Sequence, residues 1–260
     1  MVKKTLFFIV IILILVFVLF ILIQLNKNAP QSIIKNLDLK NRLTIEGKIM
    51  GFKANYLGFF GMGEAELRNK GDDSYQGKQI YHLEAKANVS KLLSIFFNAQ
   101  ARVDSYIDKN KLHSLRFSQT LILPEKPRDE KEILYDQDNN IMELRGIKRQ
   151  ILPHTQDPLS AMFYIQHQNF ELGKEFDINI NTNQNNYRLS AKVIKKEEYV
   201  IEDKNIGIWV VSGEVRRRDK SPRHSLAITL WLLNNPSKTI ILVKVITNIG
   251  PITLRLISIE

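Results

Sequence analysis

The sequence contains no cysteine at any of its 260 positions. This absence excludes a disulfide framework, a thiol nucleophile, an iron–sulfur cluster, a cysteine-ligated zinc site and a lipid-modified N-terminal cysteine. Glycine and proline are also scarce, at 12 and 8 residues, which excludes a collagen-like repeat and a low-complexity tract. The fold must therefore be stabilised by a packed core, and a chain of this length with 44% hydrophobic residues suffices for one or two domains.

Motifs of enzymes, metal sites and cofactor sites are also missing. No H-x-x-H or H-E-x-x-H pair places two imidazoles on one helix face, so we predict no metal site and expect each histidine at the surface or in an ordinary hydrogen bond. The glycine-rich segment 58–63 (GFFGMG) has the wrong spacing for a dinucleotide fingerprint or a P-loop and is interpreted as a bend between strands. We predict no catalytic residue and no cofactor, and therefore a protein that is not an enzyme. The five histidines are His82, His113, His154, His167 and His224.

A long apolar run, Thr5 to Leu25, is the most distinctive feature near the N-terminus. It contains no charged residue, and about 20 residues of helix span the roughly 30 Å hydrocarbon core of a bilayer. A cleaved signal peptide is the alternative, but the run is long and does not end in small residues. We predict a transmembrane anchor in residues 1–25, a linker in 26–42 and a β-rich domain in 43–260. Lys3 and Lys4 precede the run, which favours a cytoplasmic N-terminus and an extracytoplasmic domain.

The rest of the chain is basic. Without Lys3 and Lys4 the 37 basic residues become 35, against 27 acidic ones, which gives a net charge of +8. The charges are scattered and no nucleic-acid-binding motif accompanies them, so we predict no nucleic acid partner. The densest cluster contains solvated loop charges or, alternatively, candidates for anionic lipid headgroups. Its arginines are Arg216, Arg217, Arg218 and Arg223.

Alternation of apolar and polar residues with a period of two dominates the remaining sequence and predicts strands. The clearest case is a hairpin, in which residues 176–181 and 187–193 alternate on either side of an asparagine-rich turn. About ten to twelve short strands at this spacing predict a mainly β protein with one antiparallel, curved sheet or half-barrel. The other predicted strands are Leu43–Lys53, Gly63–Arg68, Ile80–Ala87, Ala99–Ile107, Leu115–Leu123, Ile133–Tyr135, Ile141–Leu144, Ile206–Val215, Leu226–Leu233, Thr239–Thr247 and Ile252–Ile259.

One helix is predicted over residues 158–168. Asp157 is a favourable N-cap, and Pro158 fits the first helical position because its missing N–H would have no partner there. Leu159, Met162 and Phe163 then follow at helical spacing. A second segment, residues 89–97 (VSKLLSIFF), fits a short helix or a buried strand, and we favour the helix.

The last strands differ from the hairpin because both of their faces are apolar. In Leu226–Leu233, residues 226, 228, 230 and 232 share one face and residues 227, 229, 231 and 233 share the other. One interpretation is ordinary packing against the predicted helix and against another part of a curled sheet. The other is that one face lines an apolar ligand cavity. The sequence does not separate these two interpretations.

The block Gln156-Asp157-Pro158-Leu159-Ser160-Ala161-Met162-Phe163-Tyr164-Ile165, followed by Leu172-Gly173, resembles the signature of a family of uncharacterised bacterial exported domains. Weaker similarities lie at 55–67, 101–108 and 230–251. The resemblance implies an antiparallel half-barrel with one or two short helices against its concave face, similar to lipoprotein-carrier (LolA/LolB-like) proteins. It also implies that the domain is exposed in the cell envelope. Together with the predicted anchor, this places the domain outside the bacterial inner membrane, held by a single N-terminal span.

Two hypotheses for the function follow from these patterns and this resemblance. The first is a binding module of the cell envelope that accepts a lipid or another amphipathic ligand on its apolar concave face. The alternative is an envelope assembly protein that has a filled core, binds a protein partner and takes no small ligand. The ligand-binding candidates for the first hypothesis are Leu159, Met162, Phe163, Trp209, Trp231 and Val243.

Overall fold

The structure of the protein is a computed structural model that describes residues 29–36, 48–90, 99–124, 126–201, 204–219 and 225–260. The predicted anchor, residues 1–25, lies outside the described residues. Within the part of the chain that is described, no helix combines the length and the hydropathy that a membrane crossing requires.

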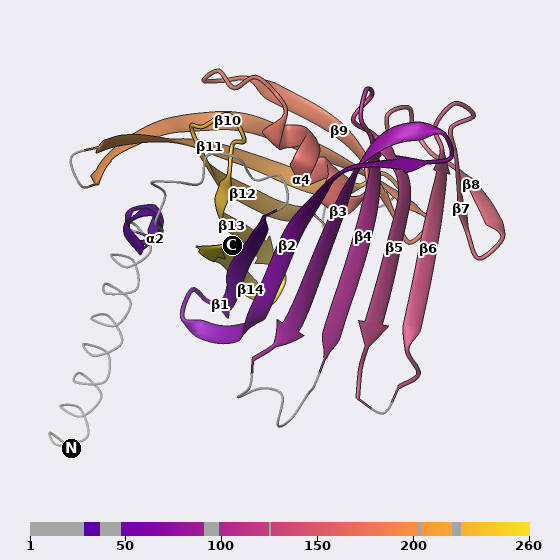
Figure 1. Cartoon of the computed structure of the whole chain (residues 1–260), viewed down its shortest axis with the longest axis horizontal. Helices are drawn as coiled ribbons and strands as arrows, with labels where there is room; N and C mark the ends of the chain where they lie inside the picture. The colour runs from indigo at the N-terminus through magenta and orange to yellow at the C-terminus, as the bar shows by residue number, and fades with distance from the viewer. Residues whose placement is uncertain (1–28, 37–47, 91–98, 125, 202–203, 220–224) are drawn as a thin grey trace, which may run out of the picture.

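Fourteen strands form one antiparallel sheet that curves around helix α4 (Pro158–Gln166) (Figure 1). The strand order is β8-β7-β6-β5-β4-β3-β2-β1-β14-β13-β12-β11-β10-β9, so that the first and last strands of the chain pair in the middle of the sheet. The prediction of a mainly β protein with a curved antiparallel sheet is confirmed. The strands are β1 (Ile49–Tyr56), β2 (Phe60–Tyr75), β3 (Lys78–Val89), β4 (Gln100–Asp108), β5 (Ser114–Ile122), β6 (Asp129–Asp136), β7 (Ile141–Leu144), β8 (Ile147–Gln150), β9 (Glu175–Thr182), β10 (Asn185–Ile201), β11 (Lys204–Arg217), β12 (Ser225–Leu233), β13 (Ile240–Thr247) and β14 (Gly250–Ile259).

Some elements differ from the prediction. β8 was not expected, because all four of its residues are exposed and show no alternation. Within the segment predicted as a linker, residues 29–36 form helix α2 (Ala29–Asn36), which contacts β10, β13 and β14. Its Ile33 and Ile34 are buried in a cluster with residues of β1 and of β11 to β14. Of the segment predicted as a second helix, Val89 ends β3, and residues 91–98 lie outside the described residues.

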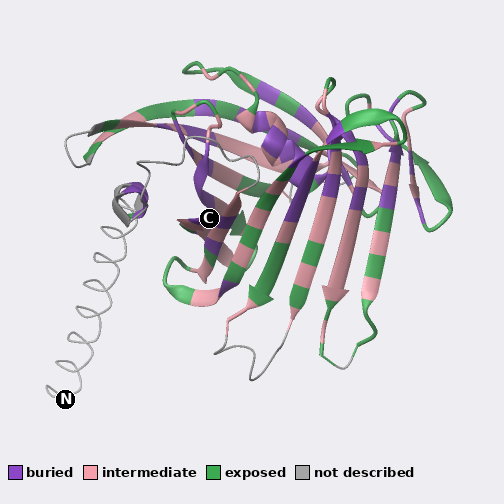
Figure 2. Ribbon diagram, viewed as in Figure 1, coloured by how far each residue is buried: buried purple, intermediate pink, exposed green. Residues whose placement is uncertain are grey.

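Helix α4 packs against both halves of the sheet, and its buried residues are shown in purple in Figure 2. Leu159 and Phe163 join a buried cluster with residues of β3 and β4. Ala161 and Ile165 join another cluster with residues of β9 to β13. The helix therefore lies between the two halves and contacts both.

The N-cap Asp157 fixes this helix in place. Its Oδ1 accepts hydrogen bonds from the backbone N–H groups of Leu159 and Ser160, at 2.8 and 2.9 Å. Its Oδ2 accepts hydrogen bonds from the hydroxyls of Ser105 on β4 and Ser114 on β5, at 2.6 and 2.7 Å. Asp157 is completely buried, and this burial raises the pKa of its carboxyl, although these four hydrogen bonds favour the charged form. One carboxyl thus caps the helix and holds it to two strands.

The residue before Asp157 ties the loop to the opposite half of the sheet. Gln156 forms a parallel bridge to Ile180 of β9, and its backbone exchanges two hydrogen bonds with Asn179 and Asn181, each at 2.8 Å. The hydroxyl of Tyr135 on β6 also donates to the carbonyl of Asn181, at 3.1 Å. These contacts join β9, at one edge of the sheet, to the β4–β6 region, and so maintain its curvature.

Replacing Asp157 by alanine should destabilise the fold by about 3 kcal/mol. About 1 kcal/mol of this comes from the lost N-cap. The rest comes from leaving the buried hydroxyl of Ser105 without an acceptor and from removing the charged acceptor of Ser114, whose hydroxyl keeps only Ser160 Oγ at 2.6 Å. The measurement is the free energy of unfolding in urea, followed by circular dichroism. Ser118→Ala, on the outer face of β5, is the control and should change stability by no more than about 0.5 kcal/mol. Equal stability of the two variants would contradict the role assigned to Asp157.

Candidate ligand-binding cavity

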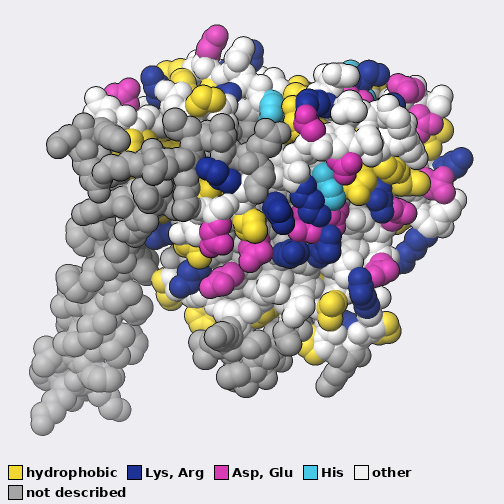
Figure 3. Space-filling view, viewed as in Figure 1, with side chains coloured by type: hydrophobic (Ala, Val, Ile, Leu, Met, Phe, Trp, Pro, Cys, Tyr) yellow, Lys and Arg dark blue, Asp and Glu magenta, His cyan; other side chains and the backbone are white. Residues whose placement is uncertain are grey.

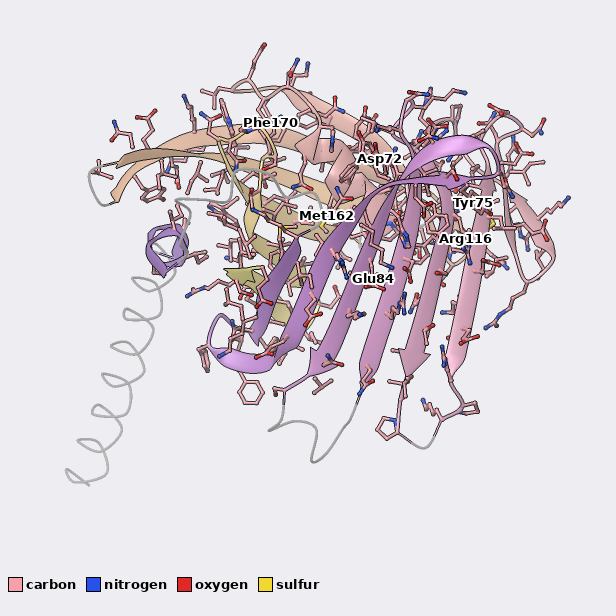
Figure 4. The ribbon with its side chains drawn as sticks, in the orientation of Figure 1. Asp72, Tyr75, Glu84, Arg116, Met162 and Phe170 are labelled. Atoms are coloured by element: carbon pink, nitrogen blue, oxygen red, sulfur yellow. The ribbon has the colours of Figure 1, made fainter. Side chains whose placement is uncertain are left out.

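A cavity of about 530 Å³ lies between α4 and the concave face of the sheet. Leu159, Met162 and Ile165 of α4 form one wall, and Met162 lies beneath the helix in Figure 4. Val103 and Phe117 contribute from β4 and β5. The opposite wall consists of residues from β9 to β14: Ile180, Thr182, Tyr187, Leu189, Ala191, Val211, Gly213, Val215, Leu226, Ile228, Leu230, Val243, Val245 and Leu254.

Strand register explains why these side chains meet. Antiparallel pairing places directly opposed residues on the same face of a sheet. Leu230 lies opposite both Val211 and Val243, and Val243 lies opposite Leu254, so the four form a continuous row across β11 to β14. This row gives the cavity an apolar wall without any polar interruption.

Gly213 leaves part of this wall without a side chain. A Cβ atom at this position would lie 2.8 Å from the Cβ of Ala191 and 2.9 Å from the carbonyl oxygen of Ser190. Such distances are below van der Waals contact, so any larger residue would push β10 and β11 apart. Gly213 and Ala191 are directly opposed on β11 and β10. Because both are small, no large side chain projects from this part of the wall into the cavity.

Few polar atoms reach the cavity. Thr182 and the Tyr187 hydroxyl are the polar side-chain groups among its lining residues. Among the described residues, the lining has no pair of titratable groups that could transfer a proton and no nucleophile with an adjacent base. The arrangement suits hydrocarbon, which needs apolar surface and no hydrogen-bond partners.

A second cavity, of about 390 Å³, lies on the other side of α4. Leu159 and Met162 line both cavities, so these two side chains separate them. The second cavity is more polar, because Asn69, Gln166 and Lys238 contribute to its lining. Partial burial lowers the pKa of Lys238, whose Nζ lies 5.4 Å from the centre of the Phe170 ring.

The structure places the six sequence-predicted ligand-binding residues in three different locations. Leu159, Met162 and Val243 line the larger cavity, whereas Phe163 lines only the smaller one. Trp209 and Trp231 line neither cavity. The indole N–H of Trp209 donates to Asn234 at 3.0 Å, and Trp231 packs against the cluster that contains Ile33 and Ile34.

Most of the cavity residues are not among the six predicted ones. Val211, Val215, Val245 and Leu254 lie in predicted strands, but the sequence does not show which strands pair with one another. The inward face of each strand could have been assigned only by knowing its neighbours and their register.

The arginine cluster lies at the end of β11. Arg216 pairs with Glu214 and Arg217 with Asp219, and Arg218 donates to Asn179 at 2.6 Å. Arg217 is opposite the cavity residue Tyr187, so it continues the inward row of β11 beyond Val215. Arg223 lies outside the described residues.

Charged side chains gather instead on the outer face of β2 to β4, where both signs are interspersed (Figure 3). Buried Glu84, labelled in Figure 4, contacts Lys70, Lys86 and Arg102 at 2.5 to 3.4 Å. Burial raises the pKa of Asp104, but hydrogen bonds from His82 and Arg102 outweigh it and lower this pKa to about 2. Each acid has cationic partners within the cluster, which is the pattern of a structural ion-pair network.

Four histidines lie among the described residues and bear on the expectation for this residue type. His154 and His167 are exposed, as expected, whereas His82 and His113 are buried. His82 meets the expectation, because its Nε2 lies 2.8 Å from Asp104 Oδ1. His113 does not, because it is only 2% exposed and neither ring nitrogen has a hydrogen-bond partner. Burial lowers the pKa of His113 to about 4, so its ring is neutral at pH 7. Among the described residues, no three His, Asp or Glu side chains are grouped closely enough to hold a metal ion.

Comparisons with known proteins give a family and a fold. The family model described as "Protein of unknown function (DUF3108)" matches residues 52–257. A beta-barrel-like protein of the domain of unknown function DUF1849, from Brucella abortus, is 10% identical with a TM-score of 0.58, and the alignment covers 84% of this chain and 98% of that chain. At this identity the likeness concerns the fold alone. No curated protein matches the sequence.

Two further solved structures have lower TM-scores. A candidate lipoprotein from Parabacteroides distasonis is 10% identical, with a TM-score of 0.33 and coverage of 84% of this chain and 96% of that chain. A candidate exported protein with a YmcC-like fold, from Bacteroides fragilis, is 11% identical, with a TM-score of 0.30 and coverage of 83% and 96%. The expected membership of an uncharacterised family is confirmed, whereas the similarity to lipoprotein carriers stays a prediction.

Neutral, buried His113 should make stability depend on pH. Its pKa rises from about 4 in the folded chain to the ordinary value of 6.5 on unfolding, so the unfolded chain binds the extra proton between these values. Stability should therefore be fully present above pH 6.5 and fall by about 2 to 3 kcal/mol as the pH drops to 4.

The measurement is the free energy of unfolding in urea at several pH values. His113→Gln should remove most of this dependence, while His167→Gln, at an exposed position, serves as the control and should retain it. A His113→Gln variant with the same pH profile as the unaltered protein would show that another group is responsible.

Proposed function

We propose a function for this chain, which belongs to the DUF3108 family of proteins of unknown function, from the geometry of its larger cavity. The protein is a non-enzymatic binding module of the bacterial cell envelope that holds a lipid or another amphipathic molecule beneath α4. The observation that carries this proposal is the cavity of about 530 Å³ with an almost wholly apolar lining. Ligand sites in proteins commonly measure about 300 to 1,000 Å³.

An acyl chain is the part of such a ligand that fits the cavity. Burial of each methylene group contributes about 0.8 kcal/mol, and the lining competes for no hydrogen bond. The few polar groups, Thr182 and Tyr187, lie at the end of the wall where Arg217 follows. A polar headgroup would therefore remain at this end of the cavity. An anionic headgroup would replace the exposed Asp219 as the ion-pair partner of Arg217.

The proposed location follows from the sequence. The apolar run Thr5–Leu25 is proposed to cross the bacterial inner membrane once, with the N-terminus in the cytoplasm and the β-rich domain outside it. The membrane is then the permanent partner of the protein, and its lipids are available to the cavity. We propose no nucleic acid partner.

Blocking the cavity should remove the ligand without unfolding the domain. In Met162→Trp, the indole should occupy space shared by both cavities and lower lipid occupancy at least fivefold. Native mass spectrometry of the chain from Ala29 onward, purified from a bacterium, measures this occupancy as a lipid-sized mass beyond the polypeptide. Tyr164→Trp is the matched control, because Tyr164 lies on the same helix and lines neither cavity. A bare polypeptide after incubation with membrane extract would refute the proposal.

The alternative function, an envelope assembly protein, is supported by one feature of the sheet. β8 is an edge strand whose four residues are all exposed, and exposed edges can pair with a strand of another protein. Crosslinking in intact envelopes should then capture one dominant partner through β8, and Lys148→Pro should abolish it. Capture that survives this substitution would exclude the edge as the binding surface.

A further inference from the structure

Two turns lie side by side at one end of the sheet, where β1 leads into β2 and β13 leads into β14 (Figure 1). The Tyr56 hydroxyl donates to the carbonyl of Ile249, and the Leu57 N–H donates to the carbonyl of Pro251 at 2.9 Å. A Cβ atom on Gly250 would lie 3.0 to 3.3 Å from the side chains of Tyr56 and Leu57, so the contact is close. We call residues 54–63 and 245–254 together the double-turn tip.

The double-turn tip presents large apolar side chains to solvent. Leu57, Phe59, Phe60, Ile246 and Ile249 are each between 44% and 71% exposed. Apolar groups gathered at one place on a surface often mark an interaction site. Leu57 also adopts a φ of +53°, which is unfavourable for a leucine, and with Gly58 it forms the bend that leads into Phe59.

The charges around this tip follow a simple pattern. Neither of its two segments contains a charged residue. The residues that immediately flank them are Lys53, Glu64, Lys244 and Arg255, which carry a net charge of +2. In the part of the chain that the structure describes, the side chains of Lys53, Lys244 and Arg255 form no ion pair and no hydrogen bond. The cations on the outer face of β2 to β4, in contrast, are paired with acidic side chains.

Register brings the three cations together on the outer face. Lys53 lies between two directly opposed residues, Arg255 on β14 and Glu64 on β2, and Lys244 lies opposite Thr253, two residues before Arg255. The group is therefore three cations and one carboxylate, with a net charge of +2. Because their neighbours Val243 and Leu254 point into the cavity, Lys244 and Arg255 point away from it. At about 3.4 Å per residue, the cations lie roughly 10 to 15 Å behind the apolar turns.

We propose that the double-turn tip inserts into the surface of an anionic lipid bilayer. Apolar groups of interfacial proteins lie about 5 to 10 Å below the headgroup boundary. At that depth the apolar turns contact acyl chains, and Lys53, Lys244 and Arg255 meet the lipid phosphates above them. A second copy of this chain is a poorer partner for the tip, because it would bring together two groups of flanking charges that each carry a net charge of +2. The proposal does not depend on ligand binding in the cavity.

The absence of cysteine allows a direct test by site-specific spin labelling. Single variants Phe59→Cys and Ile249→Cys of the full chain, labelled with a nitroxide, are reconstituted into vesicles of phosphatidylcholine and phosphatidylglycerol. Both labels should be accessible to oxygen and protected from a water-soluble nickel complex. Leu172→Cys, at a residue that is 69% exposed but remote from the tip, is the matched control and should stay in water.

The charge contribution is tested by replacing Lys53, Lys244 and Arg255 with glutamine in each labelled chain. Because each basic residue near an anionic surface strengthens attachment about fivefold, the triple variant should reduce the inserted fraction at least tenfold. Vesicles of phosphatidylcholine alone should give a similar reduction. Labels at positions 59 and 249 that remain as exposed to the nickel complex as the label at 172 would overturn the proposal. Dipolar coupling between labels of two chains would also overturn it, since a second copy would then cover the tip.

Discussion

The buried carboxyl of Asp157 is the interaction on which the rest of the architecture depends. A sheet of fourteen strands has two open edges, and nothing in its hydrogen-bonding pattern fixes how strongly it curves. Asp157 caps α4 and holds it to β4 and β5, while the adjacent Gln156 binds β9. Because the two residues are consecutive, helix position and sheet curvature are set together. None of the described cations forms an ion pair with this carboxyl, so four hydrogen bonds must offset its burial, and each donor has little freedom to move.

Holding the helix at one place leaves part of the concave face uncovered by the elements that the structure describes. Apolar surface that water can reach lowers stability, and a domain with a filled core would avoid this cost. Gly213 and Ala191 add little side-chain volume to the cavity wall, and a larger residue at position 213 would push β10 and β11 apart. Two features therefore maintain the cavity. The sheet wall contains small residues, and the side chains of Met162 and Leu159 on the opposite wall do not fill the space between the helix and the sheet. A ligand that supplies the missing apolar contacts would stabilise the fold by mass action.

The residues at its N-terminus made helix α4 predictable from the sequence, whereas only some of the residues that line the cavity could be predicted. Asp157 and Pro158 determine the helix start through backbone hydrogen bonding, and its predicted end differs by two residues from the observed one. The β9–β10 hairpin was predictable for a similar reason, since its turn has positive φ at residues 183 and 184 and Asn183 tolerates this conformation. The tryptophans show the limit. Trp209 shares a strand with Val211 of the cavity wall, but lies one step beyond it, where Asn234 and Phe170 occupy the space. Sequence alternation assigns a face, whereas position along the face depends on long-range register.

Alternation in β13 and β14 also links the inner and outer faces. Val243, Val245 and Leu254 face the cavity, and the neighbouring Lys244, Ile246 and Arg255 face outward near the double-turn tip. A register slip by one residue would exchange these sets, placing cations in the cavity and valines outside, so the pairing of β13 with β14 is strongly specified. The same strand pair therefore forms the cavity wall and supports the surface proposed to meet the bilayer.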